Sequence, residues 1–203
     1  MKIKFFNSFQ NALLFAGCLL SPVAGISQII FLDGGYSEYC ANAAYQLDNP
    51  EETLVTGSRL GLSPLEVCNR AIAEEIENRA ASFNNRGVIY FSKGDFEAAR
   101  KDFEQAIRIN NKIPDFHFNL GLALVRQRGW SESLEALNTG LGLIDELTAG
   151  GTGFNLAEIY FNRGIAFEET GNVRQAYYDY KKASELNPAW EAPQQELSRF
   201  TVR

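Results

Sequence analysis

Bulky and small residues alternate along residues 80 to 190 with the spacing of amphipathic helices, and the same order of sizes returns three times. Each return is centred on a glycine, Gly87, Gly121 or Gly164. Bulky residues stand three and sixteen positions after each glycine, and small residues stand twelve and nineteen positions after it. Small residues let two helices approach closely, and bulky residues fill the space between them. The pattern therefore predicts packed helix pairs that repeat along the chain.

The spacing of the copies indicates the type of repeat. Gly87 and Gly121 lie 34 residues apart, and Gly94 and Gly171 stand at the turn between the two helices of the first and third copies, where the second copy has Arg128. This combination resembles the tetratricopeptide repeat (TPR) family. The resemblance implies an all-α fold, a TPR-like α-solenoid of stacked antiparallel helix pairs. The implied repeats span residues 80–113, 114–147 and 157–190.

An insertion separates the second and third copies. Gly121 and Gly164 lie 43 residues apart, which places extra residues at 148–156. This stretch is rich in glycine and threonine, so we expect a flexible excursion. It lacks a following Gly-Lys-Ser or Gly-Lys-Thr, so it is not a phosphate-binding loop.

Residues 1–25 have the layout of a secretory signal peptide. Lys2 and Lys4 come first, an uncharged stretch with an apolar run over 12–20 follows, and small residues at 23–25 offer a cleavage site. The sequence therefore predicts an exported protein.

Two other interpretations of the N-terminal segment remain open. Phe15-Ala16-Gly17-Cys18 resembles a bacterial lipobox, which would give a lipoprotein acylated at Cys18. The uncharged stretch from Phe5 to Leu32 is also long enough to act as an uncleaved membrane anchor.

The charge balance bears on the partner. The chain has 19 basic and 25 acidic residues, a formal net charge of −6, and loss of Lys2 and Lys4 with the signal peptide brings it to −8. Nucleic acid and anionic lipid repel an acidic protein. We therefore expect no nucleic-acid partner. Membrane contact is expected only if Cys18 is lipidated or the signal is uncleaved.

The cysteines fit an exported protein. Loss or lipidation of Cys18 leaves Cys40 and Cys68 as a pair, and an oxidising compartment favours a disulfide between them. Two buried free thiols are the alternative. Both cysteines lie in a predicted helical hairpin over residues 36–79, a degenerate repeat whose second helix starts with a capping box at Ser63-Pro64-Leu65-Glu66. A disulfide would hold this terminal hairpin together.

Candidate catalytic chemistry is sparse. His117 is the single histidine and takes the repeat position of Phe83 and Tyr160, so we interpret it as a ring packed between helices. One histidine and two paired cysteines do not make a zinc site, so no metal is expected. No cofactor and no small-molecule substrate are expected either. Glutamates such as Glu168 and Glu169 suit solvated helix faces. We do not expect an enzyme; a hydrolase that uses groove carboxylates is the remaining alternative of that class.

In the resembling family, the first helices of the pairs line a concave groove that holds an extended peptide or a partner helix. Asn85, Asn119 and Asn162, here called the asparagine row, each stand two residues before a repeat glycine. A side-chain amide donates and accepts hydrogen bonds, so the row suits a peptide backbone. Bonds to neighbouring helices are the alternative. The implied groove positions are Asn84, Asn85, Val88, Phe91, Phe118, Asn119, Leu122, Arg126, Phe161, Asn162, Ile165 and Glu169.

The chain closes with a predicted capping helix or tail over residues 191–203, with Leu197 and Phe200 as apolar residues. The sequence thus predicts an exported scaffold or adaptor of the bacterial periplasm that binds a peptide or a partner protein in its groove. The alternative is an envelope lipoprotein or membrane-anchored assembly factor with the same fold.

Overall fold

The chain folds into two compact units, seen in a computed structural model that describes residues 3–5, 35–48, 61–147 and 155–202. The larger unit lies within residues 25–154, and the C-terminal unit combines residues 1–24 with 155–203. The predicted cleavage site, Cys18 and the glycine-rich part of the insertion lie outside the described residues.

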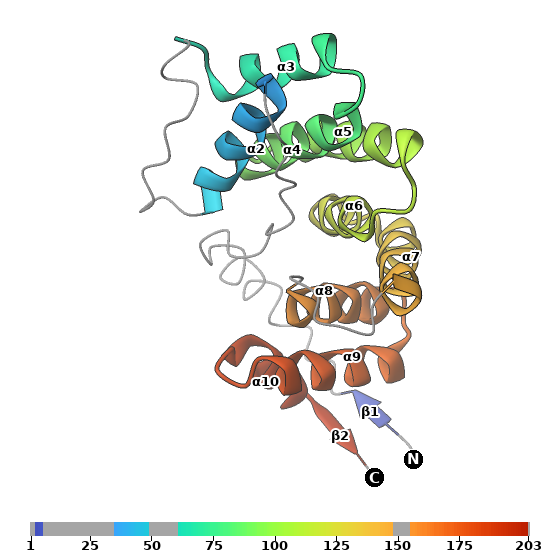
Figure 1. The fold of residues 1–203 in the computed structure, drawn as a ribbon. Helices are drawn as coiled ribbons and strands as arrows, with labels where there is room; N and C mark the ends of the chain where they lie inside the picture. Colours follow the sequence, from blue (N-terminus) through green and yellow to red (C-terminus); the bar gives the residue numbers. More distant parts are fainter. Residues whose placement is uncertain (1–2, 6–34, 49–60, 148–154, 203) are drawn as a thin grey trace. The chain divides into compact units, whose positions relative to one another are not determined.

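The larger unit is built from helix pairs, as predicted (Figure 1). Helices α4 and α5 pair, α6 and α7 pair, and α5 contacts α6, so the pairs stack. Helices α2 and α3 form the hairpin ahead of them, and both contact α4. The helices are α2 (Gly35–Asp48), α3 (Pro64–Glu74), α4 (Arg79–Ser92), α5 (Phe96–Ile109), α6 (Pro114–Arg126) and α7 (Trp130–Leu147).

The C-terminal unit contains one further pair and a small sheet. Helix α8 pairs with α9, and α10 packs against α9. The sequence predicts a helix or tail to the end of the chain; the structure ends the helix at Leu197 and continues into a strand, β2, that pairs with β1. The elements are α8 (Leu156–Glu169), α9 (Val173–Leu186), α10 (Glu191–Leu197), β1 (Ile3–Phe5) and β2 (Phe200–Val202).

The repeat glycines lie where the two helices of a pair touch. A Cβ atom built on Gly87 would stand 2.5 Å from the ring of Phe103, and one on Gly121 would stand 2.4 Å from Leu137. Real Cβ atoms do not approach other heavy atoms so closely, so only glycine fits without movement. The bulky residue sixteen positions on is therefore the partner of each repeat glycine.

The turn positions also behave alike in the three copies. Gly94 and Gly171 both have φ of 80°, and Arg128 has φ of 61°. This left-handed conformation is open to glycine and costs other residues about 1 kcal/mol or more. The second copy thus keeps the turn while carrying a side chain that disfavours it.

Apolar side chains from α8, from α9 and from the residues after α9 close the C-terminal unit. Phe200 joins Ala176 and Tyr180 in a buried cluster. The ring centroids of Phe161 and Trp190 lie 4.7 Å apart. The residues after α9 therefore cover the end of its helix pair, which a terminal repeat requires.

Among the described helices, none has the length and apolar character needed to cross a bilayer.

Candidate partner-binding face

Helices α4 and α6 bring eight of the twelve implied groove positions into one unit, and we call these eight the α4–α6 face. The two helices contact each other directly. Residues of the face are Asn84, Asn85, Val88 and Phe91 on α4, and Phe118, Asn119, Leu122 and Arg126 on α6.

Amide side chains link the two helices of the face. The Asn119 Nδ2 atom donates to Asn84 Oδ1 at 2.8 Å, and Asn84 Nδ2 donates to Asn85 Oδ1 at 3.2 Å. All three side chains are buried, with at most 1% of the residue surface exposed. The bond from Asn119 to Asn84 joins neighbouring repeats, so the row takes part in the scaffold. A scaffold role does not prevent a ligand role for the same amides.

One acceptor in this chain of amides is left over. The Asn119 Oδ1 atom is buried and has no hydrogen-bond partner in the structure. A buried polar atom without a partner costs about 1 to 3 kcal/mol. A donor that reached Asn119 would recover that free energy.

Apolar side chains surround the amides, and a cation stands at one end. Val88, Phe91, Phe118 and Leu122 are buried. Arg126, at the C-terminus of α6, is exposed, and its guanidinium carbon lies 5.7 Å from the ring centroid of Phe91. The face of an aromatic ring attracts a guanidinium cation at this distance.

The third-copy positions belong to the C-terminal unit. Asn162 is buried and donates from Nδ2 to Glu158 O within its own helix, at 2.9 Å. Phe161 and Ile165 pack on the Ala176, Tyr180 and Phe200 cluster. Glu169, the last residue of α8, is exposed. Among the third-copy positions, Phe161 and Ile165 therefore also serve their unit's core.

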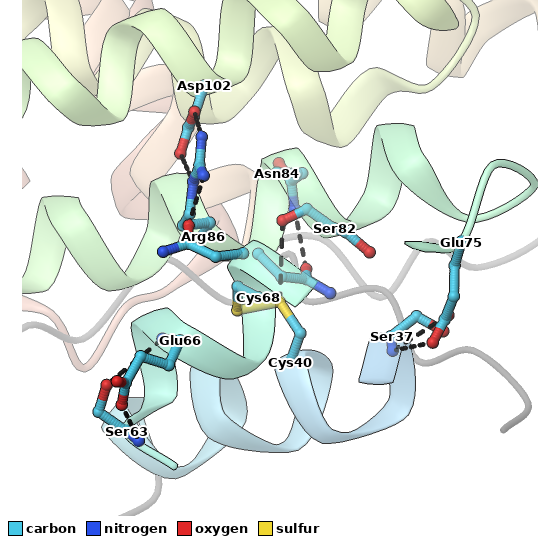
Figure 2. The surroundings of a disulfide bond; sticks show 12 residues. Ser37, Cys40, Ser63, Glu66, Cys68, Glu75, Ser82, Asn84, Arg86 and Asp102 are labelled. Carbon is cyan, nitrogen blue, oxygen red and sulfur yellow. Dashed lines mark hydrogen bonds and ion pairs between the residues drawn. A yellow bond between two sulfur atoms is a disulfide. The ribbon is translucent and has the colours of Figure 1, made fainter. Parts of the chain in front are cut away.

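The predicted disulfide is present next to the face. Cys40 and Cys68 are joined with an S–S distance of 2.13 Å, and both are fully buried (Figure 2). The Cys40 Sγ atom lies 3.7 Å from Ser82 O, in the turn of α4 that precedes Asn84. The disulfide thus fixes α2 and α3 against the helix that carries half of the face.

Caps define both ends of this hairpin. Ser63 and Glu66 form the predicted capping box, with Ser63 N donating to Glu66 Oε2 at 2.7 Å. Glu75, just after α3, accepts from Ser37 N at 3.2 Å and so caps the start of α2. A carboxylate suits this place because the helix start presents unpaired N–H groups and a positive dipole end.

A buried ion pair crosses the first helix pair, and sequence reasoning missed it. Arg86 Nε and Nη2 donate to the two carboxylate oxygens of Asp102, both at 2.7 Å. Arg86 Nη1 also donates to Asn69 on α3, at 2.6 Å. The bonds to Asp102 raise the pKa of Arg86; burial raises the pKa of Asp102, and Arg86 acts against that rise. The pair therefore ties the hairpin, α4 and α5 together.

The same pair returns in the third copy and is absent from the second. Arg163 donates to both oxygens of Asp179 at 2.7 and 2.8 Å. The corresponding second-copy positions are Leu120 and Ala136, so both charged residues are replaced by uncharged ones in that copy. An arginine one position before the glycine, matched by an aspartate fifteen after it, was the available sequence signal.

The histidine occupies the interior, in line with its interpretation from the sequence. His117 is 7% exposed, and its Nε2 atom lies 2.9 Å from Asn111 O, which ties α6 to the turn before it. No cluster of three or more His, Cys, Asp or Glu side chains with metal-binding geometry occurs in the part of the chain that the structure describes.

One carboxyl at the start of α6 has a shifted pKa. Burial raises the pKa of Asp115 to about 6, and a hydrogen bond to its own backbone acts in the opposite direction. Asp115 is the second residue of α6, four positions before Asn119. Its charge therefore changes with pH near one end of the α4–α6 face.

Sequence comparisons match two parts of the chain to repeat families. A family described as TPR repeat matches residues 87–127, and one described as Tetratricopeptide repeat matches residues 157–190. The Lipoprotein NlpI homolog of Haemophilus influenzae is 33% identical over 104 residues, which are 51% of this chain. The match spans 30% of the length of that relative.

Solved structures share the fold at low identity. MamA from Desulfovibrio magneticus RS-1 matches with a TM-score of 0.61 and 14% identity over 82% of this chain and 84% of its own. YrrB, described as a TPR protein with an unusual peptide-binding site, matches with a TM-score of 0.58 and 13% identity over 81% of this chain and 75% of its own. The first TPR of RPAP3, bound to an HSP90 peptide, matches with a TM-score of 0.51 and 20% identity over 59% of this chain and 87% of its own. The repeat matches and the paired helices together show tetratricopeptide repeats at residues 87–127 and 157–190.

Proposed function

We propose that this protein is an exported, non-catalytic interaction scaffold of a bacterial envelope, and that it holds an extended segment of another protein on the α4–α6 face. The observation that carries the proposal is the buried Asn119 Oδ1 atom, which has no hydrogen-bond partner in the structure. A backbone N–H of a bound segment would supply the missing donor once the side chains that cover this atom moved apart. A segment in extended conformation presents such donors at regular spacing, whereas the N–H groups of a helix are used internally.

The other end of the face supports the same occupant. Arg126 is exposed and lies over the ring of Phe91. Its guanidinium suits a carbonyl or carboxylate oxygen of the bound segment. The structural neighbours include a TPR protein with a peptide-binding site and a TPR bound to a peptide, which is the kind of ligand proposed here.

The cellular location is proposed from the disulfide and the relative. A disulfide between Cys40 and Cys68 is stable in an oxidising compartment, such as the periplasm. A second form is favoured by the matched relative, which is named as a lipoprotein. In that form Cys18 would be acylated, and the scaffold would be held at the membrane.

Intact mass of the protein purified from the cell envelope separates these two forms. A soluble chain that begins near Ile26 supports the periplasmic form, and an acylated chain that begins at Cys18 supports the lipoprotein. An unprocessed chain recovered from the cytoplasm would contradict export in either form.

Capture from an envelope extract tests the face itself. The bait is the tagged protein, and the variants are Asn119→Ala and Arg126→Ala. Arg108→Ala is the matched control, because Arg108 is an exposed arginine on α5 whose side chain donates to Gln105 of its own helix. All baits must first show equal helical content by circular dichroism. We expect a partner retained by wild type and by Arg108→Ala and reduced by both face variants. Equal retention by all baits would contradict binding at this face.

A further inference from the structure

The N-terminal strand β1 covers an edge of β2, and removal of the signal peptide on export would expose that edge. Strand β2 has one neighbour in its two-stranded sheet, β1, and the pairing is antiparallel with Ile3 opposite Val202 and Phe5 opposite Phe200. Strand β1 lies within the segment that the sequence predicts to be a removable signal peptide. A mature chain that begins near Ile26 would lack β1, so the backbone N–H and C=O groups of β2 that face it would lose their partners.

The place that β1 occupies is bounded by α9 as well as by β2. Strand β1 also contacts α9. Beside it, Phe200 is anchored in the cluster with Ala176 and Tyr180, and its ring centroid lies 5.7 Å from that of Tyr177 on α9. Strand β2 therefore has a fixed place on α9, and its free edge would not need to reorganise before it paired with a new strand.

We propose that β2 is a docking strand for an extended segment of a partner protein, which adds to its edge in the place that β1 fills in this structure. Addition of a strand to an exposed sheet edge is a common way to bind a peptide, since backbone hydrogen bonds are made with any compatible sequence. An unpaired strand edge also presents N–H and C=O groups that can pair with another chain. This inference rests on the proposed export and is independent of the α4–α6 face.

The sequence of β1 indicates the kind of partner. Ile3-Lys4-Phe5 alternates apolar and basic residues. A basic segment is also favoured by charge, since the chain without Lys2 and Lys4 has a formal net charge of −8. The occupant is thus an extended segment with apolar residues on either side of a lysine or arginine.

Two measurements on the protein isolated from the envelope test this proposal. Intact mass first shows whether β1 has been removed; a chain that keeps Ile3–Phe5 would overturn the proposal. The processed chain is then titrated with a fluorescently labelled peptide of residues 1–8, and binding is followed by anisotropy. The matched control peptide carries Lys4→Pro, which removes the backbone N–H at that position and fixes φ.

Protein variants locate the binding. Thr201→Pro interrupts β2 opposite Lys4, and Thr201→Val keeps a strand-forming residue at the same position. We expect saturable binding of the wild-type peptide to wild type and to Thr201→Val. The proline peptide, or the Thr201→Pro variant, should bind with an affinity at least about tenfold weaker, which corresponds to loss of one or two backbone hydrogen bonds. Equal binding in all combinations, no saturable binding, or a dimer of the processed chain that Thr201→Pro dissolves would each overturn the partner-strand proposal.

The two proposals can fail separately. Asn119→Ala changes the α4–α6 face in the larger unit and should leave binding of the residue 1–8 peptide unchanged. Thr201→Pro changes the C-terminal unit and should leave capture by the α4–α6 face unchanged. Loss of peptide binding in Asn119→Ala would contradict a docking site at β2.

Discussion

Replacing both charges of the first-copy ion pair should cost less stability than replacing Arg86 alone. The variants are Arg86→Leu, Asp102→Ala and the double variant, which gives the first copy the residues Leu120 and Ala136 of the second. The side chain of Asp102 is 6% exposed and that of Arg86 is 19% exposed. Asp102 therefore has little access to water when its partner is removed.

The magnitude follows from these exposures. Removal of one partner of a buried pair typically costs 3 to 5 kcal/mol; because Arg86 is partly exposed, we expect about 2 to 4 kcal/mol for Arg86→Leu. We expect less, about 1 to 2 kcal/mol, for Asp102→Ala, because Arg86 keeps its bond to Asn69 and can reach water. The free energy of unfolding of the double variant should lie within about 1 kcal/mol of that of Asp102→Ala, since the double variant leaves no buried charge.

Urea unfolding of the disulfide-intact protein, followed by circular dichroism at the helical band, measures the four free energies of unfolding. The exposed pair of Lys101 and Glu97 is the control, where the same cycle should give no measurable coupling free energy. A double variant whose loss equals the sum of the two single losses would refute the coupling and, with it, the explanation of the second copy's exchange.

Three further predictions concern other described residues. Arg128→Gly should raise the free energy of unfolding by about 1 kcal/mol, because φ of 61° suits glycine; a lower melting temperature would contradict this. The pKa of Asp115 is raised from 3.8 to about 6 on folding, so the folded chain binds this proton more tightly than the unfolded chain, and stability falls as pH rises between those values. Asp115→Asn should therefore be more stable than wild type above pH 6, by about 1 to 3 kcal/mol, and unfolding measured across pH would show no gain if the argument were wrong. The double replacement Cys40→Ala with Cys68→Ala should cost about 3 to 4 kcal/mol, chiefly by freeing the α2–α3 hairpin; unchanged thermal unfolding would show that the disulfide is not needed there.

The repeat and the helix starts could be predicted because each depends on local spacing. The disulfide could be predicted because Cys40 and Cys68 are the pair that remains once Cys18 is removed or lipidated. Gly87 and Phe103 are sixteen residues apart in the chain and meet across one helix pair, so their sizes reveal the contact. The capping box at Ser63 is likewise contained within four residues. Patterns of this kind repeat in the sequence, and repetition separates them from chance.

Contacts between distant parts of the chain could not be predicted in the same way. The bond from Asn119 to Asn84 connects two repeats, and the sequence alone could not decide between a scaffold role and a ligand role for the row. The pairing of β1 with β2 joins the two ends of the chain, and three-residue strands carry too little periodic pattern to be recognised. The Arg86–Asp102 pair was accessible in principle, because its exchange in the second copy is visible in the sequence.

The most direct test of the central claim is site-specific photocrosslinking in living cells. A photoreactive phenylalanine analogue replaces Arg126, on the α4–α6 face, or Arg108, exposed on α5. We expect that position 126 crosslinks to a defined partner protein, that mass spectrometry maps the crosslink to a single extended segment, and that position 108 gives no such product. The same product from both positions, or from neither in a protein that remains folded and exported, would contradict partner binding at the α4–α6 face.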